Sequence, residues 1–112
     1  KRQEVYFSEV LKGHIKAWKF HKKQTQIFVV PVGKIKVALY DSRKKSHTYK
    51  KLNEITLGVK SDYFRLKIPP KIWYGFESLV EKSLIVNMTD IIHDPKESIK
   101  MNEVNEIIPY KF

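Results

Sequence analysis

Several polar side chains that could bind an anion and move a proton lie close together early in the chain. They are Lys16, Lys19, His21 and Gln26, set among apolar and aromatic positions. Histidine titrates close to neutral pH, so His21 is a candidate general base, or else a strand histidine that is hydrogen-bonded in the barrel mouth. Lys19 is a candidate cation for an enolate or a diphosphate, and a candidate base only where burial or a neighbouring cation such as Lys16 lowers its pKa. We interpret this stretch as part of a sheet whose inner face carries the cluster, which is a common form of small-molecule site.

Other residues extend the candidate site. Tyr74 is able to protonate a substrate oxygen, or it packs as an amphipathic aromatic with its hydroxyl at the rim. Gln26 can orient a hydroxyl but cannot transfer a proton at neutral pH. Trp18 stacks on a ring or packs in the core, and Lys67 adds charge to the pocket or is solvated. We therefore predict catalytic roles for His21, Lys19 and Tyr74, and substrate-binding roles for Lys16, Gln26, Trp18 and Lys67.

The histidine pattern does not favour a metal site. Metal sites in small β-barrels commonly use a His-x-His pair with a nearby Glu, whereas this chain has Lys19-x-His21 with no Glu at short range. The other histidines, His14, His47 and His93, fall on predicted loops or strand ends, and there is no cysteine. We expect neither a metal ion nor another cofactor.

The elements that must position these residues are short strands. Alternating apolar and polar residues between turn signals predict strands over 5–10, 15–21, 25–30, 35–41, 52–59, 63–68, 72–79 and 83–89. Residues 42–51 are polar and predict a surface loop. The polar tail 96–106 predicts a short helix or irregular structure, and residues 107–110 are apolar enough to dock on the body. The expected fold is all-β, a jelly-roll barrel or sandwich with little helix.

Two finer predictions concern the stretch that carries the cluster. The Pro/Gly turn at 31–34 lies between two β-type runs, which predicts a hairpin. Strict alternation places Ala17, Lys19 and His21 on one face of their strand, and Lys16, Trp18 and Phe20 on the other.

Composition limits the possible partners. The chain has 112 residues, which suits a single domain over 1–112, and it begins with Lys1 rather than Met, so preceding residues are expected to be missing. The net charge of +10 favours anionic partners. The basic residues are mostly Lys, whereas base-reading sites favour Arg, so nucleic acid ranks last among the candidate partners. The sequence shows neither a signal peptide nor an apolar run of membrane-spanning length, which predicts a cytoplasmic protein without a membrane partner.

Three segments resemble a known family in their order and spacing. They read EVLKGHIKAWKFH at 9–21, VVPVGKIKVALYD at 29–41 and LKIPPKIWYGF at 66–76, followed by VNMTD at 86–90 and IPY at 108–110. This arrangement is similar to that of the dTDP-4-dehydrorhamnose 3,5-epimerases, of which the chain would be a divergent short relative. The resemblance implies a cupin jelly roll, a homodimer, a nucleotide diphosphate sugar as substrate, and metal-independent epimerisation beside a 4-keto group.

The resemblance also assigns residues by position. Lys16 stands where the family has a phosphate-binding Arg, and Lys19 where it has the base His. Gln26 matches a catalytic Lys, and Val86 matches an acid Tyr. Tyr74 matches the His of a His-Gly-Phe motif, and His21 matches the second His of a pattern found in some short relatives.

Two functions therefore remain open. One is an epimerase or isomerase of a nucleotide-activated keto sugar in surface-polysaccharide synthesis. The other is a catalytically inactive cupin that binds a nucleotide sugar or a partner enzyme.

Overall fold

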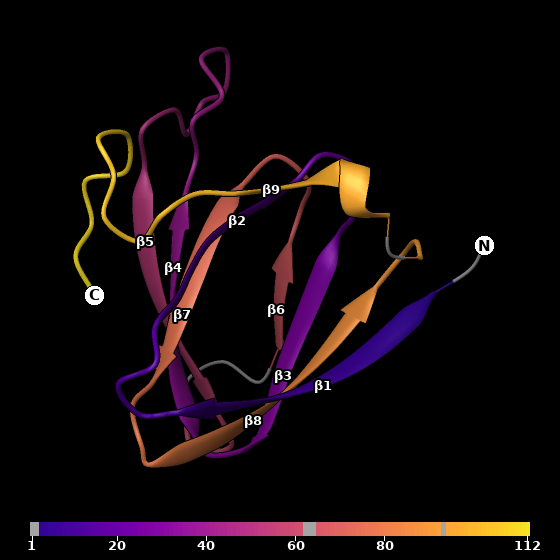
Figure 1. The fold of residues 1–112 in the computed structure, drawn as a ribbon, viewed down its shortest axis with the longest axis vertical. Coiled ribbons are helices and arrows are strands. Elements are labelled where there is room, and N and C mark those ends of the chain that lie inside the picture. Colours follow the sequence, from indigo (N-terminus) through magenta and orange to yellow (C-terminus); the bar gives the residue numbers. More distant parts are fainter. Residues whose placement is uncertain (1–2, 62–64, 93) are drawn as a thin grey trace.

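The chain folds into two antiparallel sheets packed face to face. The computed structural model describes residues 3–61, 65–92 and 94–112. One sheet has the order β1 (Glu4–Leu11), β8 (Lys82–Thr89), β3 (Gln26–Val32) and β6 (Arg65–Ile68). The other has the order β5 (Leu52–Gly58), β4 (Lys34–Tyr40), β7 (Trp73–Ser78), β2 (Lys16–His21) and β9 (Ser98–Lys100) (Figure 1). The all-β prediction is confirmed.

The core fills the space between the sheets because alternate residues of each strand point inward. Phe28 and Val30 of β3 meet Ile35 and Val37 of β4, together with Ile85 of β8, and all are buried. Removing this apolar surface from water is the main favourable contribution to folding. The period-2 pattern of the sequence thus identifies the inward-facing residues of β3 and β4.

The predicted hairpin at residues 31–34 is wrong, because β3 and β4 belong to different sheets. The chain crosses between the sheets at Gly33, which has a φ of +89°. A Cβ there would lie 2.4 Å from Ser83 Oγ, and the amide of Lys34 donates to that same oxygen at 3.0 Å. Close contact with β8 therefore directs the chain from one sheet to the other. The sequence pattern of such a crossing, two β-type runs around a Pro/Gly turn, is the same as that of a hairpin.

A bulge in β2 changes which of its residues face inward. Lys16 pairs with Phe76 and Lys19 with Tyr74, and the register shifts between Ala17 and Lys19. Directly opposed residues share a face of the sheet, so both lysines face the side of Tyr74 and Phe76, which pack in the core. The prediction that strict alternation separates Lys16 from Lys19 is wrong, because the extra residue resets the period.

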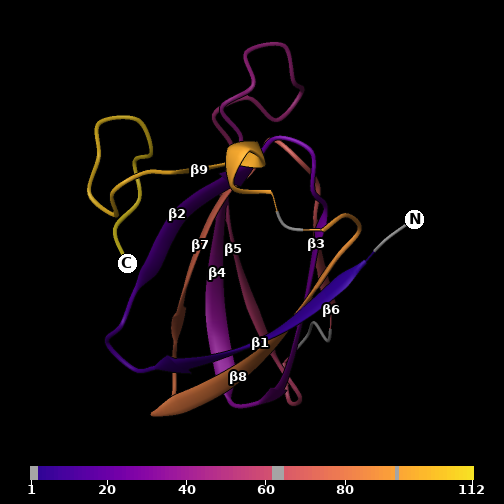
Figure 2. The same ribbon diagram turned by 45° about the vertical axis from the view of Figure 1, so that its right-hand side comes forward.

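The outer face of the five-stranded sheet is covered by the C-terminal tail. Ile108 is 3% exposed and packs with Trp18 and Tyr40. The rings of Tyr110 and Phe112 lie 5.9 and 5.4 Å from that of Trp18, and these three rings form the outer aromatic cluster. The tail lies outside this sheet in both views (Figures 1 and 2). The predicted docking of residues 107–110 is confirmed.

Most of the remaining predicted elements agree with the structure. Residues 42–51 form a mostly exposed loop, and the tail contains the short 3₁₀-helix η1 (Pro95–Glu97). The tail also contains the strand β9, which the tail prediction missed because its partner β2 is far away in the sequence. The start of the predicted strand 63–68 and His93 lie outside the described residues. No helix in the described part of the chain is long and apolar enough to cross a membrane.

Candidate active site

A cavity of about 790 Å³ opens between the two sheets. Both sheets and the segment that follows β9 contribute to its wall. Its lining includes Lys16, Lys19, Phe28, Tyr74, Phe76, Asn87 and Lys100. Its size suits a drug-sized or cofactor-sized molecule.

Aromatic rings form one wall of the cavity. Phe28 packs edge-on against Tyr74, with ring centroids 5.5 Å apart, and against Phe76 at 5.7 Å. These residues come from β3 and β7, so the wall joins the two sheets. The arrangement provides an apolar surface beside the polar groups described next.

Three lysines give the cavity a positive charge. Lys19 of β2 is directly opposite Lys100 of β9, and Lys16 precedes the bulge on the same strand. Burial, followed by the nearby charge of Lys100, lowers the pKa of Lys19, while Glu97 opposes the change. The pKa of Lys19 is thus shifted in the direction that a base requires, although the neighbouring cation is Lys100 rather than Lys16.

His21 is buried between two hydrogen-bonding partners. Its Nδ1 atom contacts Glu97 Oε1, and its Nε2 atom lies 2.9 Å from the Tyr74 hydroxyl. An ionised carboxylate only accepts hydrogen bonds, so Nδ1 donates to Glu97. In the neutral imidazole Nε2 then accepts from the Tyr74 O–H. We call these residues the buried triad Tyr74–His21–Glu97, and Tyr74 is the member that lines the cavity.

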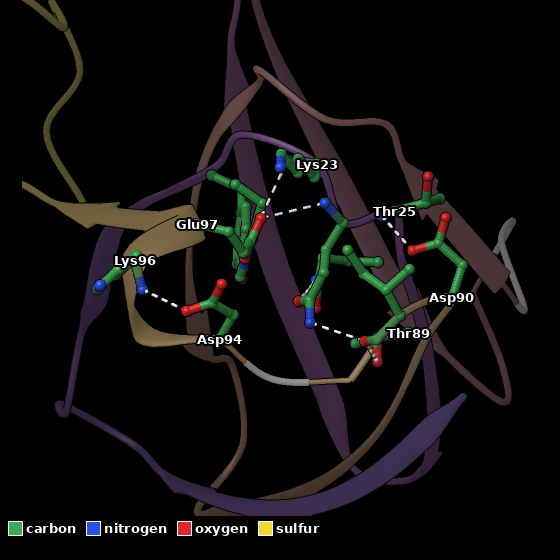
Figure 3. Close-up of polar contacts among 12 residues, drawn as sticks. Lys23, Thr25, Thr89, Asp90, Asp94, Lys96 and Glu97 are labelled. Carbon is green, nitrogen blue, oxygen red and sulfur yellow. Dashed lines mark hydrogen bonds and ion pairs between the residues drawn. The ribbon is translucent and has the colours of Figure 1, made fainter. Parts of the chain in front are cut away.

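Glu97 is held in place by backbone donors as well as by His21. Its Oε2 atom accepts from the amides of Lys23 at 3.0 Å and Gln24 at 3.1 Å (Figure 3). Burial raises the pKa of Glu97, whereas the hydrogen bonds from His21 and these amides lower it. The lowering is the larger effect, so the pKa of Glu97 lies below its ordinary value. Glu97 is consequently an ionised partner for the imidazole at neutral pH.

Sequence reasoning missed Glu97 because it lies in a tail predicted to be polar and irregular. The local signal was the helix start at Asp94-Pro95, where the Asp94 side chain accepts from the amide of Lys96 at 3.0 Å (Figure 3). That signal indicates a turn. It does not indicate that the turn delivers a carboxylate to a histidine on a distant strand.

Tyr74 is held as a protonated phenol. Burial, and then the negative charge of Glu97, raise its pKa above the ordinary value of 10.0. The side chain is 5% exposed, and its ring stacks on that of His21 with centroids 5.8 Å apart. Because the single Tyr74 proton is donated to His21, the phenol oxygen has lone pairs free for a group in the cavity.

The other predicted site residues lie in different environments. Lys16 is exposed at the cavity wall. Lys67 is exposed on β6 and is not among the described residues that line the cavity. The Trp18 ring is 1% exposed within the outer aromatic cluster, although the residue forms part of the wall. Gln26 is buried, and both ends of its amide are hydrogen-bonded. The structure thus groups Lys16, Lys19, His21 and Tyr74, and leaves Lys67 outside.

Among the described residues, no group of three or more His, Asp or Glu side chains is placed to hold a metal ion. The polar side chains that line the cavity include lysines, a tyrosine and asparagines, which are groups suited to hydrogen bonding and to anions.

Comparison with known proteins places this chain in a family. The family model FdtA, described as WxcM-like, C-terminal, matches residues 1–108. The chain belongs to this family. It is 32% identical over 107 residues to a probable low-salt glycan biosynthesis epimerase, Agl13, of Haloferax volcanii, a match that covers 94% of this chain and 65% of the relative. The chain therefore spans slightly less than two thirds of that relative's length.

Solved structures agree with this assignment. A dTDP sugar isomerase from Desulfovibrio desulfuricans G20 is 47% identical, with a TM-score of 0.91 over 96% of this chain and 69% of that chain. The dTDP-4-dehydrorhamnose 3,5-epimerase of Bacillus anthracis is 23% identical, with a TM-score of 0.80 over 98% of this chain and 63% of that one. The second likeness shows the shared jelly-roll fold. The predicted resemblance to nucleotide-sugar epimerases and isomerases is confirmed.

Proposed function

We propose that this domain binds a dTDP-linked keto sugar and moves a proton at a carbon next to the ketone. The observation that carries the proposal is the buried triad Tyr74–His21–Glu97, which ends at a cavity lined by lysines. The naming of one similar protein as a dTDP sugar isomerase, and of another as a probable glycan biosynthesis epimerase, supports this substrate class.

The lysines account for binding of the nucleotide diphosphate. Lys19 and Lys100 are opposed across two strands, an arrangement that is unfavourable for like charges unless an anion lies between them. Lys16 and Lys100 are exposed at the cavity wall, where they suit the diphosphate. Lys19 is more buried and faces Tyr74, which suits the enolate oxygen formed when the ketone is activated.

The triad accounts for the proton transfer. The substrate carbon next to the ketone gives its proton to the Tyr74 oxygen, while the Tyr74 proton passes to Nε2 of His21. The imidazolium that forms is stabilised by the Glu97 carboxylate, and Lys19 pairs with the enolate. Because the raised pKa of Tyr74 disfavours a free phenolate, the two transfers are coupled. For an isomerisation, a proton then moves from the neighbouring hydroxyl to the enolate oxygen, and the proton held by Tyr74 and His21 returns to the former carbonyl carbon. For an epimerisation, a proton returns to the opposite face of the first carbon.

Deuterium exchange tests the chemistry. The protein is incubated in D₂O with dTDP-4-keto-6-deoxyglucose, and label in the sugar is followed by mass spectrometry. We expect exchange with the parent protein and a loss of about 100-fold or more in Tyr74→Phe, the range for loss of a general acid or base. Lys19→Met should also lower the rate, whereas Lys44→Met, the same change on the exposed loop, should not.

The outcome separates the two functions left open by the sequence. Absence of exchange in the parent, with a melting temperature raised by dTDP, would identify an inactive cupin that binds a nucleotide sugar. If neither dTDP nor a dTDP sugar changes the melting temperature at millimolar concentration, the epimerase or isomerase and the nucleotide-sugar-binding cupin are both overturned. An inactive cupin that binds a partner enzyme would then remain.

The predicted homodimer and cytoplasmic location stay predictions. The edge strand β1 supports dimerisation because it exposes Val5 at 59%, Phe7 at 73% and Leu11 at 46%. Contiguous exposed apolar side chains on an edge strand are a usual site of association. Light scattering on the purified protein would measure the mass directly.

A further inference from the structure

A chain of three side-chain amides, two of them buried, ends at the cavity. The side chain of Gln24 donates through Nε2 to the carbonyl of Ile91 at 2.8 Å. Gln26 Nε2 donates to Gln24 Oε1 at 2.8 Å, and Asn87 Nδ2 donates to Gln26 Oε1 at 2.8 Å. Asn87 lines the cavity, whereas Gln26 is not among the described residues that do. We call Gln24, Gln26 and Asn87 the amide chain.

The chemistry of the first link decides the orientation of every amide in the chain. The carbonyl of Ile91 only accepts, so Gln24 must present its NH₂ group there and its oxygen to Gln26. Gln26 must then present its NH₂ group to Gln24 and its oxygen to Asn87. Asn87 consequently gives its NH₂ group to Gln26. The Asn87 carbonyl oxygen is then the one end of the amide chain that is not yet paired. Its direction is set by the Ile91 carbonyl, which is not among the described residues that line the cavity.

That oxygen is buried and has no hydrogen-bond partner among the described residues. An unsatisfied buried acceptor is unfavourable, and few are found in folded proteins. Within the amide chain, Gln26 Nε2 donates to Gln24 Oε1, and Gln26 Oε1 accepts from Asn87 Nδ2. A donor supplied by a bound molecule would satisfy it.

The position of Asn87 indicates which donor that is. Asn87 is opposite Phe28 in the register, and Phe28 packs on the ring of Tyr74. Through Phe28, Asn87 of the four-stranded sheet lies next to Tyr74 of the five-stranded sheet, the sheet that also carries Lys16 and Lys100. An ionised diphosphate carries no donor for a carbonyl oxygen. A sugar hydroxyl does.

We propose that Asn87 Oδ1 accepts a hydrogen bond from a hydroxyl of the sugar ring, and that Gln26 is a positioning residue that keeps this oxygen turned toward the sugar. The inference rests on the proposed function and deepens it by assigning a specificity-determining residue. It explains why the position matched to a catalytic lysine is occupied by Gln26, which acts through Asn87 rather than on the substrate.

Calorimetric titration with two probes tests the proposal. dTDP carries the base and the diphosphate, and dTDP-glucose adds the sugar hydroxyls. In Asn87→Leu, which keeps the size and removes the acceptor, we expect affinity for dTDP-glucose to fall about tenfold and affinity for dTDP to stay within about twofold. Gln26→Met leaves the Asn87 amide free to rotate, so it should reduce the preference for dTDP-glucose in the same direction and to a smaller extent.

The remaining outcomes overturn either the inference or the function. If the parent binds both probes and Asn87→Leu changes neither affinity, or lowers both equally, the assignment to a sugar hydroxyl is overturned while the proposed function stands. A parent that binds dTDP-glucose no more tightly than dTDP overturns it as well. Failure of the parent to bind either probe overturns the proposed function itself. Should Asn87→Leu not fold, as judged by circular dichroism, Gln26→Met decides the question through the same ratio of affinities.

Discussion

The two faces of β2 differ in what holds them together. On the outer face, Trp18 packs with Tyr110 and Phe112, and Phe20 packs on Trp73 with centroids 5.0 Å apart. On the inner face, the residues that follow the bulge, Lys19 and His21, meet a tyrosine hydroxyl, a carboxylate and a second lysine. One strand thus contributes apolar packing on one side and a polar site on the other.

The difference shows where stability and function reside. Apolar rings removed from water stabilise the fold without further requirements. Buried ionisable groups lose hydration and must recover it through hydrogen bonds, and Lys19 opposite Lys100 is not compensated in this way by the described residues around it. The outer face therefore anchors the tail that carries Glu97 toward the site, and the inner face keeps charges that a ligand would satisfy.

The largest expected effect comes from removing the central ring of the outer face. Trp18→Ala should lower the free energy of unfolding by about 3–5 kcal/mol, the range for a large buried side chain. The change also deletes the Trp18 Nε1 donor to the Glu103 carbonyl at 3.2 Å. Urea denaturation followed by far-UV circular dichroism measures the change in the free energy of unfolding. Trp18→Phe, which retains a ring, should cost clearly less, and an equal cost for both would contradict a packing role.

A smaller effect with a distinctive pH dependence is expected on the inner face. Glu97→Gln should cost about 2 kcal/mol at neutral pH, since hydrogen bonds to a buried charged group are lost. Folding lowers the pKa of Glu97 below its ordinary value of 4.5, so the stabilisation is present above that pH. It is lost as the pH falls through the pKa of the folded state.

The unfolding free energies of the parent and of Glu97→Gln should therefore converge below about pH 4.5, where the carboxylate of the unfolded chain takes up protons. Denaturation curves collected from pH 7 to pH 3 give this difference directly. Asp41, whose pKa is lowered by Arg43 and Thr48, contributes equally to both proteins and cancels. A gap that stays constant with pH would show that Glu97 is not an ionised partner of His21.

The smallest effect is expected where charge meets the outer face. Lys36 lies 3.3 Å from Glu77, and its ammonium group is 5.4 Å from the centre of the Tyr110 ring. Lys36→Met keeps the apolar stem and should cost less than about 1 kcal/mol. The cost should shrink further when salt is raised. Thermal melts at low and high salt measure this cost. A loss of stability as large as that of Trp18→Ala would contradict the expectation that packed rings stabilise the outer face more than its charges do.

The site residues differ in how well the local sequence pattern predicted their positions. The inward direction of Lys19 and His21 follows from alternation and was predicted. The inward direction of Lys16 depends on the bulge before Lys19, which no spacing rule indicates. Trp18 and Lys67 have side chains that suit ligand binding. Trp18 is instead buried by the C-terminal tail, and Lys67 is exposed on β6, and both outcomes depend on segments distant in the sequence.

The amino-acid sequence by itself determined the strands, the all-β class, the positive charge and the docking of the apolar end, because these follow from period-2 burial, turn residues and composition. The tertiary structure alone decided that Glu97 meets His21, that Asn87 is oriented by Gln26, and that β3 and β4 part into separate sheets. The physical reason is range. Alternation and turn preference act between neighbours in the chain, whereas partners far apart in sequence are chosen by how two whole sheets pack.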